Sequence, residues 1–234
     1  FVLDNLAPAT EAKRNKWVIK QLGKIPMDSS LLDVGAGEMP YKIFCKNLKY
    51  KSQDFGKYTG KDVNSGIKSG DYDTKNVDII SDITDIPVKN DSFDYVLCTE
   101  VFEHIPDPLN ALKEISRVNK KKLILTAPFA SLTHFYPYFF YTGFSEQFYK
   151  VNLPKFGYKI EEIYLYGNYF DLLGMELMRL PLIVGNYSKI FVIVLLPLVL
   201  LAFPLLILLR ILSKLFNQSN NIFCFGICVL AKKP

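Results

Sequence analysis

Short apolar runs alternate with amphipathic stretches along most of the chain. The runs of strand length are 31–34, 50–54, a short stretch within 77–87, 92–98, 122–127, 160–166 and 221–231. Hydrophobic residues at helical spacing predict helices over 9–22, 41–47 and 107–118. Because strands and helices alternate, we expect an α/β fold built on a doubly wound parallel sheet.

A second pattern interrupts this alternation near the C-terminus. Ile190–Leu209 contains 20 residues without a charge, and a helix of that length reaches about 30 Å, enough to cross a bilayer. Pro197 and Pro204 predict that it breaks into two short helices. If 221–231 returns to the sheet, both ends of the segment lie on one side, which favours a re-entrant or interfacial helical hairpin. A true span and a buried dimer interface are the alternatives.

These patterns divide the chain into four parts. We expect an N-terminal helical segment over 1–28, a ligand-binding α/β domain over 29–175, an apolar membrane-associated insertion over 176–220, and a final strand within 221–234. Residues 56–76 are rich in Gly, Lys, Asp and Ser and are expected to form a surface loop.

The charge distribution indicates which binding partners to expect. The net charge is +5, yet residues 1–175 contain 22 Lys and Arg against 22 Asp and Glu. The positive excess therefore lies in 176–234, around the apolar segment. This favours contact with an anionic membrane surface through residues 180–216, and no nucleic-acid partner is expected.

The four cysteines are scattered, and residues 1–20 show no signal peptide. We therefore expect reduced thiols. Cys224 and Cys228 lie four positions apart in an apolar run, but we predict no metal site.

A glycine turn follows the first predicted strand and indicates a nucleoside site. Asp33 precedes Gly35 and Gly37, and Asp54 follows 21 positions after Asp33, at the end of the second strand. Glycines let a backbone approach a ligand closely, and an acid in that position can accept hydrogen bonds from both ribose hydroxyls.

Three stretches together resemble the class I S-adenosylmethionine-dependent methyltransferases, in the type 11-like group that methylates small molecules, glycans and lipids. They are LLDVGAGEMPY (31–41), DIISDITDIPVKNDSFDYVLCTEVFEHIPDP (78–108) and KKLILTAPF (121–129). The resemblance covers about residues 10–170 and the last strand. It implies a Rossmann-like sheet of seven strands with the last one antiparallel, here with a C-terminal apolar helical insertion. It also implies S-adenosyl-L-methionine as the cofactor.

The resemblance assigns the first half of the cofactor site. Asp33, Gly35 and Gly37 match the first motif, whose glycine backbone lies against the methionine part of the cofactor, and Asp54 matches the ribose-binding acid. One departure is that residues 38–40, Glu-Met-Pro, lack the third glycine that many members have.

It also assigns the second half. Asp82 and Ile83 match the positions that flank adenine, and Thr99 and Glu100 match the loop that approaches the sulfonium. Asp82 could instead be a simple loop acid, and Glu100 could be a surface ion-pair residue. The pair Glu103–His104 matches an E-H pair that often orders this loop, so we expect a structural role for it.

His134 is the candidate catalytic residue. It follows the fifth strand, at the carboxyl edge where substrates dock in open α/β sheets, and a hydroxyl acceptor benefits from a general base. Residues 134–142 resemble an H-x-x-P-x-D-F-x-R-Y-T pattern of glycan-biosynthesis methyltransferases, although the Asp and Arg are not kept. Nearby aromatics either stack on a sugar or prenyl substrate or simply pack, and packing is favoured; they are Tyr136, Tyr138, Tyr141 and Phe144.

The sequence thus predicts a transferase on the cytoplasmic side of a membrane, monotopic or single-pass. Its expected reaction is methylation of a hydroxyl on a glycan or lipid-linked intermediate. The alternatives are a lipid or quinone methyltransferase and a non-catalytic, cofactor-binding scaffold protein.

Overall fold

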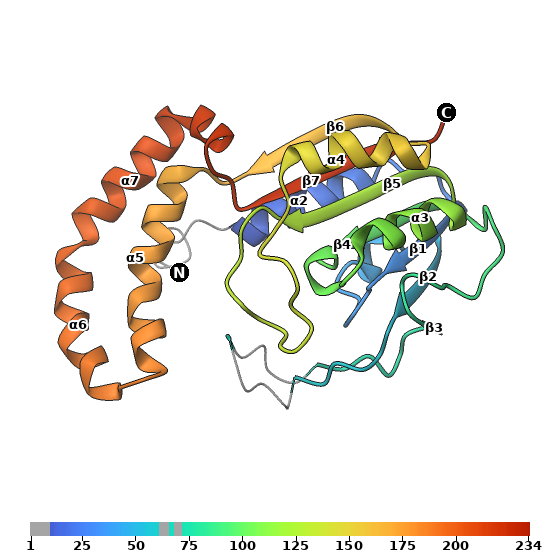
Figure 1. Ribbon diagram of the computed structural model, residues 1–234. Coiled ribbons are helices and arrows are strands. Elements are labelled where there is room, and N and C mark those ends of the chain that lie inside the picture. The colour runs from blue at the N-terminus through green and yellow to red at the C-terminus, as the bar shows by residue number, and fades with distance from the viewer. Residues whose placement is uncertain (1–9, 61–65, 68–71) are drawn as a thin grey trace. The chain divides into compact units, whose positions relative to one another are not determined.

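A computed structural model describes residues 10–60, 66–67 and 72–234, which form two compact units (Figure 1). The sheet unit comprises residues 14–164 and 226–234. The helical unit comprises residues 165–225 together with the described residues before Arg14. The two units are described separately.

The sheet has seven strands in the order β3-β2-β1-β4-β5-β7-β6. Neighbours from β3 to β5 are parallel, and β7 runs antiparallel to β5. This confirms the predicted Rossmann-like sheet with an antiparallel last strand. The strands are β1 (Ser30–Val34), β2 (Lys49–Asp54), β3 (Ile79–Ile80), β4 (Phe93–Thr99), β5 (Asn119–Pro128), β6 (Lys159–Tyr166) and β7 (Gly226–Lys232).

The register brings the carboxyl ends of three strands together. Val34, the last residue of β1, pairs with Gln53 of β2 and with Cys98 of β4. The segments that follow these strands therefore emerge side by side at one edge of the sheet, where open α/β folds bind their ligands.

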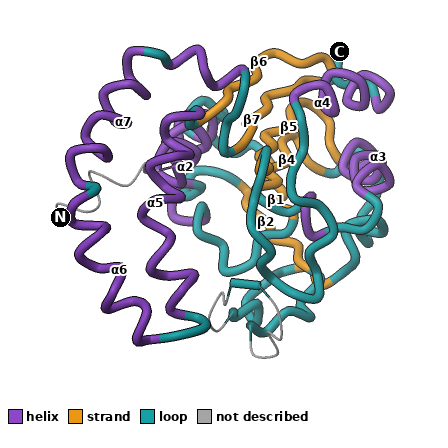
Figure 2. The backbone as a smooth tube through the Cα atoms, turned by 60° about the vertical axis from the view of Figure 1, so that its left-hand side comes forward, coloured by secondary structure: helices purple, strands orange, loops and turns teal. Residues whose placement is uncertain are grey.

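Helices cover both faces of the sheet. The helices α3 (Pro108–Val118) and α4 (Glu146–Asn152) lie on one face and α2 (Thr10–Leu22) lies on the other (Figure 1). Figure 2 shows the same layers from a second direction. The inner faces are buried at Trp17, Val18, Leu22, Leu112, Ile115 and Val118. The expectation that Leu109 lies on the same face of α3 was wrong, because its side chain is 41% exposed. Asp107 caps α3 by accepting a hydrogen bond from the Asn110 amide at 3.0 Å.

Two predicted elements were wrong in extent. The helix expected over 41–47 is a single 3₁₀ turn, η1 (Lys42–Phe44), because the amides of Phe44 and Cys45 bond to carbonyls three residues back instead of four. The last strand begins at Gly226, and residues 217–221 form a 3₁₀ turn, η4. Of the expected loop 56–76, residues 61–65 and 68–71 lie outside the described residues, as does Ala9.

The helical unit is an antiparallel hairpin. One arm is α5 (Tyr169–Gly185), and the other consists of α6 (Lys189–Leu201) and α7 (Phe203–Leu215) in succession (Figure 1). The apolar segment is divided at Ala202, with Pro204 in the first turn of α7 as expected. The expected break at Pro197 was wrong, because this proline lies inside α6. Among the described residues, no helix has both the length and the apolar character required to cross a bilayer.

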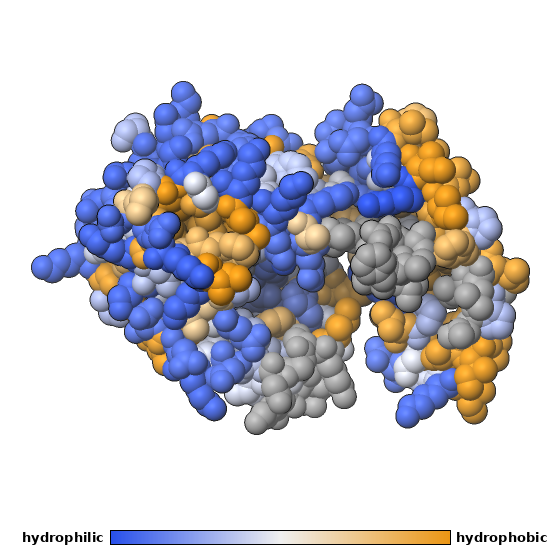
Figure 3. Space-filling model, turned by 180° about the vertical axis from the view of Figure 1, so that it is seen from behind, coloured by the Kyte–Doolittle hydropathy of each residue, from blue (hydrophilic) through white to orange (hydrophobic). Residues whose placement is uncertain are grey.

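The helical unit leaves hydrophobic side chains on its surface while it buries one acid. Figure 3 shows orange, hydrophobic side chains gathered along these helices. Asp171, by contrast, is buried and receives contacts from Lys13 Nζ at 3.0 Å, Ser213 Oγ at 2.7 Å and Arg210 Nη1 at 3.4 Å. All of these residues belong to the helical unit.

Candidate active site

The glycine turn after β1 has the backbone that the sequence predicts. Gly35 and Gly37 adopt φ of 65° and 53°, values that glycine tolerates best. A Cβ on Gly35 would lie 2.4 Å from the Val101 side chain. The turn is therefore closed to larger residues, and its backbone amides face the neighbouring strand end.

Asp54 lies directly beside this turn. Its carboxylate is 4% exposed and accepts hydrogen bonds from the Gly37 amide at 3.0 Å and from the Gly56 amide at 2.9 Å. Each carboxylate oxygen has a second lone pair, so Asp54 can accept ribose hydroxyls while it holds the turn. This geometry fits the ribose-binding role that the resemblance assigns.

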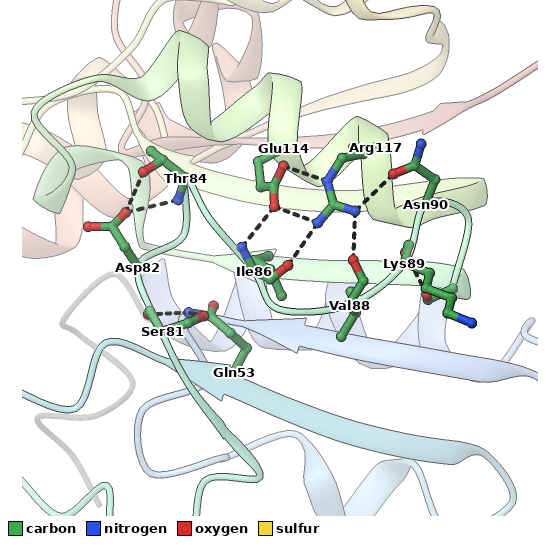
Figure 4. A network of polar contacts seen from close by, with 11 residues as sticks. Gln53, Ser81, Asp82, Thr84, Ile86, Val88, Lys89, Asn90, Glu114 and Arg117 are labelled. Carbon is green, nitrogen blue, oxygen red and sulfur yellow. Dashed lines mark hydrogen bonds and ion pairs between the residues drawn. The ribbon is translucent and has the colours of Figure 1, made fainter.

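Gln53 joins the glycine turn to the adenine loop, a role that sequence reasoning missed. Its side-chain oxygen accepts the Gly35 amide at 3.3 Å, and its Nε2 donates to the Ser81 carbonyl at 2.7 Å (Figure 4). Gln53 is the penultimate residue of β2 and is buried. The signal available in the sequence was a polar residue one position before Asp54, the predicted ribose-binding acid.

The predicted adenine residues, Asp82 and Ile83, come directly after Ser81 in the chain. Asp82 is exposed and accepts hydrogen bonds from the Thr84 amide at 2.9 Å and from the Thr84 hydroxyl at 2.8 Å, whereas Ile83 is buried (Figure 4). These bonds use one carboxylate oxygen of Asp82, Oδ1. Asp82 thus has the contacts of a loop acid, and its other oxygen is available to an exocyclic amine.

A partly buried ion pair between Arg117 and Glu114 fixes the next part of the loop. Arg117 Nη2 donates to Glu114 at 2.7 Å and to the Ile86 carbonyl at 2.8 Å, and its Nη1 donates to the Val88 carbonyl at 2.6 Å (Figure 4). Glu114 accepts the Ile86 amide at 2.8 Å, and the bond from Arg117 lowers the pKa of this carboxyl. Helix α3 therefore supports the adenine side of the site.

Asp33 contacts the strand beside it. Its carboxylate is buried and accepts a hydrogen bond from the Tyr50 hydroxyl at 2.7 Å. Burial raises the pKa of Asp33 to about 7, against the opposing effect of the Tyr50 bond. The carboxyl of Asp33 thus joins β1 to β2 below the glycine turn.

Glu100 lies at the end of β4, directly after Thr99. Its backbone has a φ of 54°, and its amide donates to the Thr126 carbonyl at 2.9 Å. The carboxylate accepts the Thr126 hydroxyl at 2.8 Å and pairs with Arg14 of α2 at 3.0 Å. The ion pair that we weighed as an alternative is present, and it ties the N-terminal helix to the carboxyl edge of the sheet.

The predicted structural role of Glu103–His104 agrees with the contacts. The Glu103 carbonyl accepts the Phe140 amide at 2.9 Å, and His104 Nδ1 lies 2.6 Å from the Tyr138 carbonyl. These bonds hold the aromatic loop against β4. Burial lowers the pKa of His104 to about 4, so its imidazole is neutral near pH 7.

His134 lies in the same loop, which contacts the glycine turn through two aromatic residues. Its ring is half-buried, and its Nδ1 lies 2.8 Å from the Leu132 carbonyl. The next residue, Phe135, packs on Tyr72 with ring centroids 5.2 Å apart. The Tyr72 hydroxyl in turn lies against Gly37, because a Cβ there would be 1.9 Å from it. Two aromatic residues therefore connect His134 to the cofactor turn.

The aromatic cluster mainly packs, as the favoured interpretation predicted. Tyr138 contacts Phe55 with ring centroids 4.9 Å apart, the Tyr141 hydroxyl donates to the Pro106 carbonyl at 3.0 Å, and Phe144 is buried. Tyr136 and Tyr141 are the two exposed members of the four, at 42% and 36%.

Comparisons with known proteins agree with this geometry. Residues 32–125 match a family model described as a methyltransferase domain, of type 11. No curated protein matches the chain. Two similar solved structures are a methyltransferase-like protein from Bacillus halodurans, at 14% identity and a TM-score of 0.53, and the YcgJ protein from Bacillus subtilis, at 15% and 0.53. Each alignment covers 93% of this chain, and 98% and 97% of those chains respectively.

A third similar structure belongs to a protein named for a different reaction, so the fold alone does not identify the reaction. The [4+2]-cyclase SpnF aligns over 95% of this chain and 82% of its own, at 14% identity and a TM-score of 0.54. At such identities the likeness shows the fold alone. The family match carries more, and it covers the glycine turn, Asp54, Asp82 and Glu100.

Residues 32–125 therefore match the methyltransferase domain of the type 11 family, which is a class I S-adenosylmethionine-dependent methyltransferase domain. Its cofactor is S-adenosyl-L-methionine, and the residues at the carboxyl edge of the sheet fit that molecule.

Proposed function

We propose that this methyltransferase transfers a methyl group to a hydroxyl of a glycan or lipid-linked intermediate on the cytoplasmic side of a membrane. In this proposal His134 contacts the acceptor hydroxyl, and the helical unit rests on the membrane surface. The observation that carries the membrane part is the apolar surface of the helical hairpin.

The cofactor half of the site supports the chemistry. S-adenosylmethionine supplies a methyl group on a positively charged sulfur. The Asp54 carboxylate would bind the ribose, the glycine turn would hold the methionine part, and Ile83 and Asp82 would hold adenine. What remains for the protein is to orient the acceptor and to exclude water, and such positioning supplies much of the rate in this kind of displacement.

The acceptor side points to a hydroxyl. A neutral hydroxyl is a weak nucleophile and gains from a group that polarises it or removes its proton. His134 is half-buried beside the aromatic residues that reach Gly37, and its Nδ1 lies 2.8 Å from the Leu132 carbonyl. When Nδ1 donates to this carbonyl, the lone pair of Nε2 is directed elsewhere and can serve the acceptor.

The helical hairpin supports membrane contact because its hydrophobic side chains are turned outward. Several are more than two-thirds exposed: Leu182 at 71%, Ile190 at 75%, Leu201 at 77% and Leu215 at 70%. An exposed apolar surface of this kind marks a membrane or protein contact. Lys214 is exposed on α7 next to Leu215, and cations beside apolar residues favour an anionic lipid surface.

Flotation with lipid vesicles tests the membrane part. The triple variant Ile190→Glu, Leu201→Glu, Leu215→Glu should lose binding to vesicles of phosphatidylglycerol and phosphatidylcholine, because each change places a carboxylate on the apolar surface. Met27→Glu is the matched control, since Met27 is 71% exposed but belongs to the sheet unit. Equal flotation of the triple variant and the wild type would refute the proposed surface.

Methyl transfer from radiolabelled S-adenosylmethionine to membrane extracts tests the reaction. Label that enters the aqueous phase after mild acid hydrolysis of lipid-linked glycans is the expected result. Label that stays in the organic phase would instead support a lipid or quinone methyltransferase, which the apolar helices favour equally well. If cofactor binding is measurable but no acceptor takes up label, the scaffold interpretation replaces the enzymatic one.

A further inference from the structure

The two histidines of the chain meet in one place. The chain contains only His104 and His134, and their ring centroids lie 4.8 Å apart. Glu103 joins them, and one ligand atom from each of the three residues lies within 4.8 Å of the others. All three residues belong to the sheet unit.

One atom of this cluster lacks a partner. The Glu103 side chain is 1% exposed, and its Oε2 is buried without a hydrogen bond in the described structure. Burial, and then the nearby Glu100 carboxylate, raise the pKa of Glu103 well above its ordinary range. A buried carboxylate oxygen without a donor costs free energy, and a bound cation would relieve both the desolvation and the repulsion.

The two imidazoles are oriented as metal ligands commonly are. His104 Nδ1 lies 2.6 Å from the Tyr138 carbonyl, and His134 Nδ1 lies 2.8 Å from the Leu132 carbonyl. A carbonyl only accepts, so each Nδ1 carries the proton and each Nε2 keeps its lone pair. Backbone carbonyls that fix the Nδ1–H tautomer in this way are the usual outer shell of a histidine ligand.

The spacing is close to that of a coordinated set. His104 Nε2 lies 3.6 Å from Glu103 Oε1. With metal–ligand bonds of about 2.1 Å, neighbouring ligand atoms are about 3.4 Å apart in a tetrahedron. The three ligand atoms lie within 4.8 Å of one another, so the His134 ring, which is half-buried, would have to move closer to complete the set.

We propose that Glu103, His104 and His134 bind a divalent transition-metal cation of the Zn²⁺, Mn²⁺ or Fe²⁺ type. Two imidazoles and one carboxylate on one side of an ion leave open positions, and this ligand set favours such ions over Ca²⁺ and Mg²⁺. The proposed site differs from the expectation of no metal, which considered only Cys224 and Cys228. Sequence alone did not show that residues 30 positions apart would meet.

This inference rests on the proposed function and deepens it. The cluster lies on the acceptor side, next to Phe135 and the residues that lead to Gly37. The open positions of the cation would take the acceptor hydroxyl, so His134 contacts the acceptor through the ion. A bound cation lowers the pKa of a coordinated oxygen acid, which is the help a hydroxyl acceptor needs.

Histidine NMR tests the site directly. With ¹⁵N-labelled histidine, every imidazole signal of the protein comes from His104 or His134. After treatment with a chelator, Zn²⁺ should shift the Nε2 signals of both residues together and saturate at one equivalent. A shift of one histidine alone, or of neither in the folded protein, would overturn the proposal.

A variant identifies the carboxylate ligand. Glu103→Gln keeps the shape and removes the charge, and it should weaken Zn²⁺ binding by at least about tenfold. Glu146→Gln is the matched control and should leave Zn²⁺ affinity unchanged, because Glu146 is partly exposed, pairs with Lys150 and is outside the cluster. Unchanged affinity of Glu103→Gln would also overturn the three-ligand site.

These readouts are independent of methyl transfer. Calorimetric binding of S-adenosylmethionine to the same samples reports on the methyltransferase site alone. Cofactor binding without the histidine shifts would remove the metal site and keep the proposed function. Histidine shifts without cofactor binding would keep the metal site and remove the proposed function.

Discussion

The two units use the same hydrophobic residue types in opposite ways. In the sheet unit, Val96, Leu97 and Leu125 are completely buried. In the helical unit, Leu201 and Ile190 are more than 70% exposed, although they belong to the most apolar part of the sequence. Hydrophobicity along a sequence therefore does not decide burial, because burial depends on a neighbour that covers the residue.

The comparison extends to two buried aspartates. Asp33 in the sheet unit receives a hydrogen bond from the Tyr50 hydroxyl, and its pKa is raised to about 7 because it is buried. Asp171 in the helical unit receives contacts from Lys13, Arg210 and Ser213. Burial thus disfavours the charged form of Asp33, whereas two cations offset the cost of burying the Asp171 carboxylate.

The largest expected effect is the difference between two leucines. Leu97→Ala should lower the free energy of unfolding by about 2–5 kcal/mol, because it leaves a cavity in a packed core. Leu201→Ala should change it by less than about 0.5 kcal/mol, since the side chain is exposed. Urea unfolding followed by Trp17 fluorescence and by circular dichroism measures both. Equal losses would show that Leu201 is covered in solution.

The second effect concerns Asp33, whose replacement by Asn should increase the free energy of unfolding. Because its pKa is about 7 when folded and 3.8 ordinarily, the folded protein keeps a proton in this window that the unfolded chain has lost. Stability therefore falls as the pH rises from about 4 to 7 and stays lower above it. Asp33→Asn removes this loss, so it should stabilise the protein by up to about 4 kcal/mol at pH 8 and have little effect at pH 4. A constant difference between the two pH values would contradict this explanation.

The third effect has the opposite sign. Asp171→Ala removes the acceptor for Lys13, Arg210 and Ser213 and should destabilise the helical unit by about 1–3 kcal/mol, a figure reduced because both cations are partly exposed. Hydrogen exchange along α5 and α7 measures this locally. Glu176→Ala is the control, because its exposed pair with Arg179 should contribute under about 0.5 kcal/mol.

The sequence predicted which strand ends would lie together at the edge of the sheet, because local motifs mark them. Gly35, Gly37 and Asp54 follow strands whose lengths and order are visible as apolar runs, and a parallel sheet brings such strand ends together. Gln53 was missed, since a lone polar residue in a strand does not reveal its two partners.

The acceptor half could not be predicted in the same way. His134 meets Glu103 and His104 through a loop that is held by backbone hydrogen bonds to residues near β4. No periodicity encodes such contacts.

The smallest effect on stability, and the sharpest on the cofactor site, is expected at Asp82. Asn at this position keeps the oxygen that accepts both Thr84 hydrogen bonds, so the fold should be unchanged. It replaces the second oxygen by an amide that cannot accept the adenine amine, which should weaken S-adenosylmethionine binding about tenfold, as for one charged hydrogen bond. Calorimetry of S-adenosylmethionine binding to Asp82→Asn and to Asp54→Asn measures this effect. A larger loss of affinity is expected for Asp54→Asn. Unchanged affinity of Asp82→Asn would make Asp82 a loop acid only, and the adenine would then be held by the packing of Ile83 and by the loop that Gln53 and Arg117 fix.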